Sequence, residues 1–208
     1  MTKISLQNLG KRYNREWIFR NLSYDFFSGK SYAITGPNGS GKSTLLQVIG
    51  GALMHNEGTI SYSDPTREQA DGSSPGVPYQ RISIAAPYLE LIEEMTANEM
   101  LSFHSQFKSF TRSENEILEA VGLSDASRKQ IRYFSSGMKQ RLKLAQAFFS
   151  DTPILLLDEP TTNLDEDGIA LYHQLVADHT IDRLVLVSSN DKQEYGFCGD
   201  TIDIAMYK

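Results

Sequence analysis

The chain has a single cysteine, Cys198, among its 208 residues. One thiol cannot form an internal disulfide or a cysteine-based metal site, which excludes the disulfide-rich secreted class and fits a reducing cytosol. Long apolar runs are also lacking, since the longest unbroken ones, at 154–157 and 184–187, fall far short of the roughly eighteen residues of a membrane span. The segment 1–6 lacks the apolar core of a signal peptide. We therefore expect a soluble, cytoplasmic protein that acts at a membrane only through a partner.

Positive charge is in short supply. The chain has 20 Lys and Arg residues against 26 Asp and Glu, which gives a formal net charge of −6. The sequence pI is about 5.2. Because nucleic-acid binding depends on clustered basic residues, no nucleic-acid partner is expected. The length suits one domain of generous size with a sizeable core.

A glycine-rich stretch at 36–44 matches the phosphate-binding pattern G-x-x-x-x-G-K-[ST] at every fixed position. It follows an apolar-rich run at 31–35, which predicts a buried strand, and precedes one at 45–49, which predicts a helix. Glycines let backbone N–H groups approach phosphate oxygens, and the helix N-terminus adds a positive dipole. A turn that binds nothing is the alternative. The predicted phosphate-binding residues are Gly36, Pro37, Asn38, Gly39, Ser40, Gly41, Lys42, Ser43 and Thr44.

Two carboxylates end the apolar run at 154–157, namely Asp158 and Glu159. In an open α/β sheet, ligands bind beyond the carboxyl ends of the strands, so both would meet the phosphates. Neighbouring strand residues point to opposite faces, which allows the two carboxylates different roles. Ser43 and Asp158 are the predicted Mg²⁺ ligands, and Glu159 is the predicted general base for an attacking water. An acidic turn at a strand end is the alternative.

Tyr13 lies between the first two predicted strands, where an aromatic ring could stack on an adenine base. Trp17 is the rival for this role, and Arg12 could assist by cation–π packing. The alternative is an ordinary aromatic residue of the sheet.

The remaining apolar patterns alternate between strand and helix. Strands are predicted at 4–6, as an edge strand, and at 17–27, 58–62, 81–86, 154–157, 184–187 and 201–204. The segment 63–80 is rich in Pro, Gly and Ser and predicts a mobile loop. A helix is predicted at 169–177, with Leu171, Leu175 and Val176 on its buried face.

Two further helices are predicted between the strands at 81–86 and 154–157. Capping-box patterns open them at 96–99 and at 111–114. Their apolar faces are formed by Met100, Leu101 and Phe103 and by Ile117, Leu118 and Val121. We therefore expect an all-helical lobe inserted into an α/β core.

The stretch 134–141, Phe-Ser-Ser-Gly-Met-Lys-Gln-Arg, stands between the phosphate loop and the two carboxylates, and Thr-Asn-Leu-Asp follows them at 162–165. With these motifs the whole chain resembles the ATP-binding cassette of ABC transporters, in an exporter-like variant. The resemblance implies that Ser135, Ser136 and Gly137 form the signature and that Asp165 belongs to the D-loop. Ser135 is also a good helix N-cap, and a plain cap is the alternative.

The resemblance implies a P-loop NTPase core with a mostly parallel sheet, an antiparallel β edge subdomain and an inserted helical lobe. It implies a single domain over 1–208, with a core lobe at about 1–86 and 151–208 and a helical lobe at about 87–150. ATP and Mg²⁺ are the implied cofactors. The implied partners are a second copy, in a head-to-tail homodimer formed on ATP binding, and a separate transmembrane subunit docking near Pro87–Thr96. That subunit would hold the chain at the inner face of the membrane.

Two positions depart from the family pattern. Pro87 stands where the family has a Gln that touches Mg²⁺ and water, and Asn190 stands where it has a His that contacts the γ-phosphate. The candidate catalytic residues are therefore Glu159, Lys42 and Asn190, and hydrolysis is expected to be slow. The predicted function is an ATPase subunit that powers a membrane exporter. The alternative is a soluble, non-transport cassette with weak hydrolysis that acts in regulation or assembly.

Overall fold

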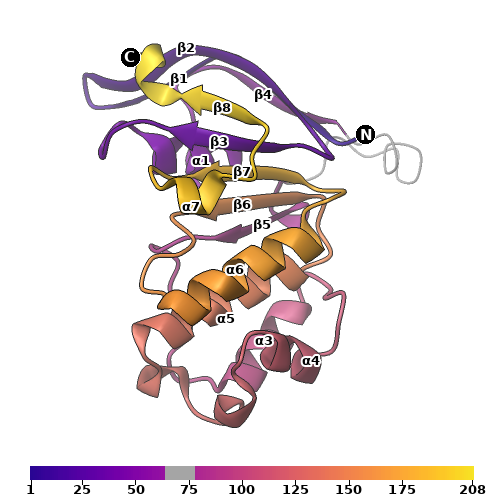
Figure 1. Cartoon of the computed structure of the whole chain (residues 1–208). Coiled ribbons are helices and arrows are strands. Elements are labelled where there is room, and N and C mark those ends of the chain that lie inside the picture. The colour runs from indigo at the N-terminus through magenta and orange to yellow at the C-terminus, as the bar shows by residue number, and fades with distance from the viewer. Residues whose placement is uncertain (64–77) are drawn as a thin grey trace.

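The computed structural model describes residues 1–63 and 78–208. Figure 1 shows a small sheet lying over a larger one, with helices on the far side of the larger sheet. The loop expected at 63–80 falls for the most part on 64–77, outside the described residues. In the described part of the chain, no helix has the length and apolar character to cross a membrane.

The smaller sheet is antiparallel. Its strands are β1 (Lys3–Tyr13), β2 (Glu16–Phe27) and β4 (Glu57–Ser63), in the order β2-β1-β4. The prediction of an edge strand at 4–6 is wrong, because β1 is the central strand and pairs with both neighbours. Ile4 and Leu6 are buried on one face of the sheet. Such alternation indicates that the other face of the sheet is solvated, and it does not distinguish an edge strand from a central one.

The larger sheet has five strands in the order β5-β6-β7-β3-β8, and its four pairings are all parallel. The strands are β3 (Ser31–Thr35), β5 (Ile82–Ala85), β6 (Ile154–Asp158), β7 (Leu184–Ser188) and β8 (Asp200–Asp203). Every residue of β6 and β7 is buried, as continuous apolar runs predict for parallel strands covered on both faces. The carboxyl ends of the strands meet at one edge, where Asp158 pairs with Ser188.

The helices cover both faces of the parallel sheet. They are α1 (Lys42–Ile49), α3 (Ala97–Ser105), α4 (Glu114–Ala120), α5 (Ser136–Phe149), α6 (Glu166–His179) and α7 (Lys192–Tyr195). Short 3-10 turns lie at Pro78–Gln80, Ser124–Ala126, Ile131–Tyr133 and Ile204–Tyr207. In Figure 1, α5 and α6 lie against the sheet while α3 and α4 lie farther from it. Since α3, α4 and α5 fall between β5 and β6 in the chain, the predicted fold class, with its helical insertion, is confirmed.

Two apolar cores flank the parallel sheet. One joins the antiparallel sheet and α1 to one face and includes Phe19, Phe26 and Leu46. The other joins α3, α4, α5 and α6 to the opposite face and includes Leu101 and Phe148. The parallel strands supply residues to both clusters and are therefore the shared centre of the fold.

Details of the helical insertion correct the sequence prediction. Phe103 is 42% exposed instead of buried, whereas Met100 and Leu101 belong to the core as predicted. The second helix begins at Ser113, whose N–H and hydroxyl both donate to the Glu116 carboxylate. Thr111 is not the cap, because its N–H and hydroxyl donate to the Phe149 carbonyl.

The helix predicted at 169–177 forms as part of α6. Leu175 and Val176 are buried as expected, while Leu171 is only partly buried. Tyr172 is fully buried, and its hydroxyl donates to the Glu194 carbonyl at 2.6 Å.

Candidate functional site

The phosphate loop connects β3 to α1. Gly41 caps the helix with φ 107°, and no side chain bonds to the first-turn N–H groups from this position. These N–H groups and the helix dipole are the parts of an anion site. Gly41 also permits close packing, because a Cβ there would lie 2.3 Å from the Ile18 side chain. The local sequence therefore produces an open helix N-terminus under a tightly packed loop.

Lys42 spans the loop from inside. Its side chain is buried, and Nζ donates to the carbonyl oxygens of Gly36 at 2.9 Å and Pro37 at 3.4 Å. A cavity of about 210 Å³ opens beside it. The lining residues are Ile18, Asn38, Gly39, Gly41, Lys42, Ser43, Thr44 and Glu159. The ammonium group thus lies at a concave surface lined by backbone donors, which suits a polyphosphate.

Asp158 ends β6 at 1% exposure. Burial raises the pKa of its carboxyl group, and the nearby hydroxyls of Ser188 and Ser43 and the charge of Lys42 act in the opposite direction. Among the described residues, neither Asp158 Oδ1 nor Ser188 Oγ completes a hydrogen bond. A buried carboxylate oxygen with a spare lone pair and a neighbouring serine hydroxyl fit Mg²⁺, which prefers oxygen ligands and shares its shell with substrate phosphates.

Glu159 has a different environment. It is exposed, and its φ of 43° lies in the left-handed region that a side-chain-bearing residue adopts at a cost. Glu159 lines the cavity at the phosphate loop and also a second one of about 260 Å³. The second cavity is lined by Glu159, Thr161, Thr162, Ser189, Asn190, Asp191 and Glu194. Of the two adjacent carboxylates, Asp158 is therefore buried beside serine hydroxyls, and Glu159 faces open cavities.

Asn190 follows β7 and lies beside the phosphate loop. Its Nδ2 donates to Asn38 Oδ1 at 2.9 Å, and it lines the second cavity with Glu159. The carboxyl ends of β3, β6 and β7 thus bring Lys42, Asp158, Glu159 and Asn190 to one edge of the sheet, which is where open α/β sheets bind their ligands.

The residues at 135–137 and 165 lie at the starts of helices. Ser135 is the N-cap of α5 and accepts from Met138 N–H at 3.2 Å. Asp165 is the N-cap of α6, accepts from Gly168 N–H at 2.9 Å and pairs with Arg141 at 3.0 Å. These two contacts lower the pKa of Asp165, the backbone bond more than the Arg141 bond. Among the described residues that line the phosphate-loop cavity, none comes from 134–141.

Comparison with known proteins identifies the family. A family model described as ABC transporter matches residues 19–162. The chain belongs to the ABC transporter family. It is similar to the uncharacterized ABC transporter ATP-binding protein YybJ of Bacillus subtilis, with 33% identity over 195 residues that cover 92% of this chain and 87% of the relative. It is also similar to the lantibiotic transport ATP-binding protein SrtF of Streptococcus pyogenes, with 30% identity covering 96% and 85%.

Solved structures share the fold of this ABC protein. A putative ABC transporter ATP-binding protein from Pyrococcus furiosus superposes with a TM-score of 0.79, at 20% identity and 99% coverage of both chains. A bacterial Atm1-family ABC exporter with ATP bound gives a TM-score of 0.80 at 18% identity, over 98% of this chain and 38% of that one. The P-loop fold and the identification as an ATP-binding subunit of an ABC transporter agree with the site geometry.

The two candidate base-stacking aromatics of the ABC protein lie on the β1–β2 hairpin. Tyr13 is 47% exposed, and the Lys11 ammonium lies 5.0 Å from its ring centre. The cation expected beside Tyr13 was Arg12, and this is wrong. The Arg12 and Arg20 guanidinium groups instead lie 5.4 and 4.6 Å from the ring centre of Trp17, because Arg12 pairs with Trp17 across the strands.

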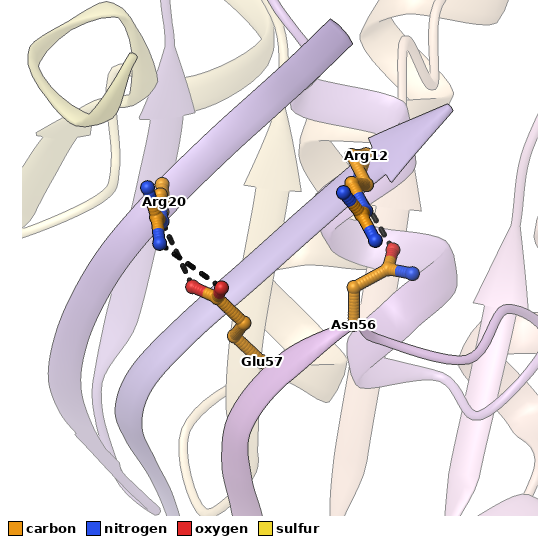
Figure 2. A network of polar contacts seen from close by, with 4 residues as sticks. All are labelled: Arg12, Arg20, Asn56 and Glu57. Carbon is orange, nitrogen blue, oxygen red and sulfur yellow. Dashed lines mark hydrogen bonds and ion pairs between the residues drawn. The ribbon is translucent and has the colours of Figure 1, made fainter. Parts of the chain in front are cut away.

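Further polar contacts hold the two arginines in place. Figure 2 shows Arg20 bonded to both oxygens of the Glu57 carboxylate, at 2.8 and 3.0 Å. The backbone N–H of Arg12 donates to Asn56 Oδ1 at 3.0 Å. Two guanidinium groups therefore already contact Trp17. Among the described residues that line the phosphate-loop cavity, the hairpin contributes Ile18 and neither aromatic.

The sequence interpretation missed Tyr88. Pro87 has no polar side-chain atom, but the next residue brings its hydroxyl close to Asp158 and to the Gln47 side chain. Burial, and after it the Asp158 charge, raise the pKa of Tyr88 above its ordinary value, against the effect of Gln47. The place of Tyr88 depends on the register of β5 against β6, with Ala85 opposite Leu157, which no local sequence pattern specifies.

Proposed function

We propose that the chain hydrolyses ATP to ADP and phosphate as one of two identical cassettes and that it powers a separate membrane subunit of an exporter. The observation that carries this proposal is that the two adjacent carboxylates at the end of β6 have different surroundings. Asp158 is buried beside Ser43, whereas Glu159 faces the cavity that contains the uncapped start of α1. A nucleotide bound there would have its phosphates between the loop and Glu159.

Each residue of the site has a proposed part in hydrolysis. The N–H groups of 39–44 and Lys42 would bind and orient the β and γ phosphates. Ser43 and Asp158 would hold Mg²⁺, which when bound neutralises charge on the phosphates. Glu159 would accept a proton from the attacking water. The Asn190 amide, beside Asn38, would donate to the γ-phosphate, and Tyr13 would stack on the adenine.

The second cassette would complete the site. Ser135, Ser136 and Gly137 begin α5, a helix N-terminus that provides an anion site away from the cavity of its own chain. A head-to-tail homodimer would place this signature on the ATP bound by the opposing phosphate loop. Asp165, held by Arg141 close to the start of the same helix, would lie at the dimer contact.

A membrane partner would dock at 87–96. A cavity of about 300 Å³ lies there, lined by Pro87, Leu89, Glu90, Leu91, Glu93, Lys139 and Lys143. Two of the three acids in this segment form ion pairs, Glu93 with Lys139 and Glu94 with Arg132. The third, Glu90, acts on Lys143 across the cavity and would also face a basic or N-terminal helix end of the partner. The names of relatives support export, since one is a lantibiotic transport protein and another, from Rhizobium etli, a cytochrome c biogenesis export protein.

The rate is proposed to be low. Pro87 offers no side-chain donor or acceptor, and Asn190 cannot carry a charge. The hydroxyl of Tyr88, beside Asp158, supplies part of what Pro87 lacks. The chain therefore keeps the groups that bind ATP and the general base, with fewer groups to orient the water.

An ATPase assay with Mg²⁺ tests the proposal. The wild type should release phosphate from ATP. Glu159→Gln should still bind ATP and lose about a hundredfold or more of the rate, in the range that a general base contributes. Lys42→Ala should lose ATP binding, and Lys129→Ala, at an exposed lysine outside the site, serves as the control. A wild type that binds ATP without releasing phosphate would contradict the proposed hydrolysis.

A further inference from the structure

One peptide group after the candidate base is held from both sides by buried polar side chains. Gln140 Nε2 on α5 donates to the carbonyl oxygen of Pro160 at 2.7 Å. Glu194 Oε1 on α7 accepts from the N–H of Thr161 at 2.7 Å and from its hydroxyl at 2.5 Å. Gln140 is 3% exposed and Glu194 4%. The C=O and N–H of a trans peptide point in opposite directions. The two side chains therefore bind the Pro160–Thr161 peptide group from opposite sides.

The backbone just before this peptide needs such support. Glu159 has φ 43°, a conformation that persists in a residue with a Cβ only where the surroundings impose it. Its N–H donates to the Ser188 carbonyl at 2.9 Å, and its own carbonyl accepts from Thr162 N–H at 3.1 Å. The peptide gripped by Gln140 and Glu194 lies inside the turn that this second bond closes. The direction of the Glu159 side chain into its cavity thus depends on the held turn.

The two gripping residues belong to elements that carry other parts of the site. Gln140 lies on α5, the helix that begins at Ser135. Glu194 lies on α7, which follows Asn190 and its bond to Asn38 in the phosphate loop. Contacts between α5 and the turn continue farther along, since Arg141 bonds to Asp165 at 3.0 Å. A shift of α5 or α7 would therefore move the turn, because each helix is joined to it by a direct hydrogen bond.

We propose that Gln140 and Glu194 are positioning residues that hold the Pro160–Thr161 peptide and thereby aim Glu159 at the attacking water. The proposal rests on the hydrolytic role of Glu159 proposed above. It predicts a loss of rate without loss of nucleotide affinity. Neither residue lines the phosphate-loop cavity, whereas Glu194 lines the second cavity, beside Glu159. A displacement of about 1 Å at a reacting group can lower a rate by about a hundredfold.

The test compares kcat, KM and ATP affinity in purified variants, with the melting temperature as a measure of the fold. Gln140→Leu and Glu194→Leu remove the grip, and Thr161→Val removes one hydrogen bond while keeping the side-chain shape. Glu194→Gln keeps an oxygen that can accept from Thr161. The matched control is Gln146→Leu, a buried glutamine of the same helix whose Nε2 has no hydrogen-bond partner among the described residues.

The leucine variants should lose about tenfold or more in kcat, with KM for Mg-ATP and the Kd of a fluorescent ATP analogue within about twofold of wild type. Glu194→Gln should recover most of the rate, and Gln146→Leu should keep it. If the leucine variants do not fold, Thr161→Val decides, with an expected loss of about threefold to fivefold in kcat. The opposite result is a lower melting temperature with a kcat per folded molecule within about twofold of wild type. It would show that these contacts only stabilise the fold, and it would overturn the proposal. A wild type without ATPase activity would instead overturn the proposed function on which it rests.

Discussion

Asn190 donates a hydrogen bond from its side-chain amide to the side-chain oxygen of Asn38, 2.9 Å away. The two residues come from the ends of different parallel strands, β7 and β3, and the bond joins the loop after β7 to the phosphate loop. The Asn190 amide therefore contacts the loop that we propose binds the γ-phosphate. Its neighbour Asp191 caps a short helix through Gln193 N–H, so the loop after β7 is bonded at both residues.

Replacing Asn190 by histidine should raise kcat and make it depend on pH. A charged donor at the γ-phosphate stabilises developing charge better than an amide, and one well-placed donor can change a rate on the order of a hundredfold. Histidine titrates near pH 6.5, so the rate should change between roughly pH 6 and 7.5 in the variant and stay flatter in the wild type. Steady-state assays of both proteins across that range measure the effect. An unchanged rate and pH profile would place residue 190 away from the γ-phosphate.

ATP should drive dimerisation of the Glu159→Gln variant. This change keeps the size of the side chain and removes the proton acceptor, so the ATP-bound dimer should accumulate. Size-exclusion chromatography with and without Mg-ATP measures it. Glu119→Gln, at an exposed position of α4, is the control and should elute as the wild type does. A Glu159→Gln protein that stays monomeric at saturating ATP would contradict the two-cassette arrangement.

Local patterns in the sequence predicted much of the fold and the centre of the site. The unbroken apolar run before Asp158 predicted a covered strand. Strand alternation predicted different surroundings for Asp158 and Glu159, but the structure separates them in another way, because β6 ends at Asp158 and Glu159 turns out of the strand with φ 43°. The buried strand itself follows from the pattern of a few neighbouring residues. The structure agrees, with Asp158 at 1% exposure and Glu159 exposed.

Contacts between distant segments were beyond the same reasoning. The central position of β1 depends on which strands it pairs with, and the exposure of Phe103 depends on what packs against α3. The Gln140 and Glu194 contacts join residues that lie 20 and 33 positions apart in the chain. Tyr88 lies one residue after the position that the family pattern assigns to its Gln, so the pattern alone does not point to its hydroxyl. The periodicity of apolar residues predicts which face of a helix or strand a residue lies on, but it does not predict which residue packs against it.

A cysteine at position 90 should cross-link to the membrane subunit. Glu90 is exposed and lines the cavity at 87–96. The native thiol should interfere little, because burial raises the pKa of Cys198 to about 12, and Cys198→Ser removes it altogether. Glu119→Cys on α4 is the matched control. Cross-links from Glu119→Cys and none from Glu90→Cys would contradict docking at this cavity.

Removing the Tyr88 hydroxyl should weaken Mg²⁺ binding at the site. Tyr88→Phe keeps the ring and removes the hydroxyl on which the Asp158 charge acts. Loss of a single hydrogen-bonding group corresponds to about 1 kcal/mol, so the Mg²⁺ concentration for half-maximal ATPase activity should rise about fivefold. The affinity for ATP without Mg²⁺ should not change, which a fluorescent nucleotide can verify. Tyr79→Phe, at a tyrosine that is 51% exposed, is the control, and equal effects of both changes would rule out a special place for Tyr88.

Acid should destabilise the protein through His104. Burial lowers the pKa of His104 to about 4, with a smaller contribution from the Lys108 charge, and Nε2 lies 3.0 Å from Ser150 Oγ. An unfolded chain would bind this proton near pH 6.5, so the unfolded state binds more protons than the native state between pH 6.5 and 4. Stability contributed by neutral His104 is therefore complete above pH 6.5 and is lost as the pH falls towards 4.

Replacing His104 by glutamine isolates this effect. At pH 7.5 the change removes the ring stacked on Phe110, 5.2 Å between centres, and should lower stability. At pH 5 the wild type should have lost about 2 kcal/mol of unfolding free energy through His104 that His104→Gln does not lose. Urea unfolding at both pH values gives the difference, with His55→Gln, at an exposed histidine, as the control. Equal losses between pH 7.5 and 5 in the wild type and His104→Gln would mean that His104 is free to protonate within the folded protein.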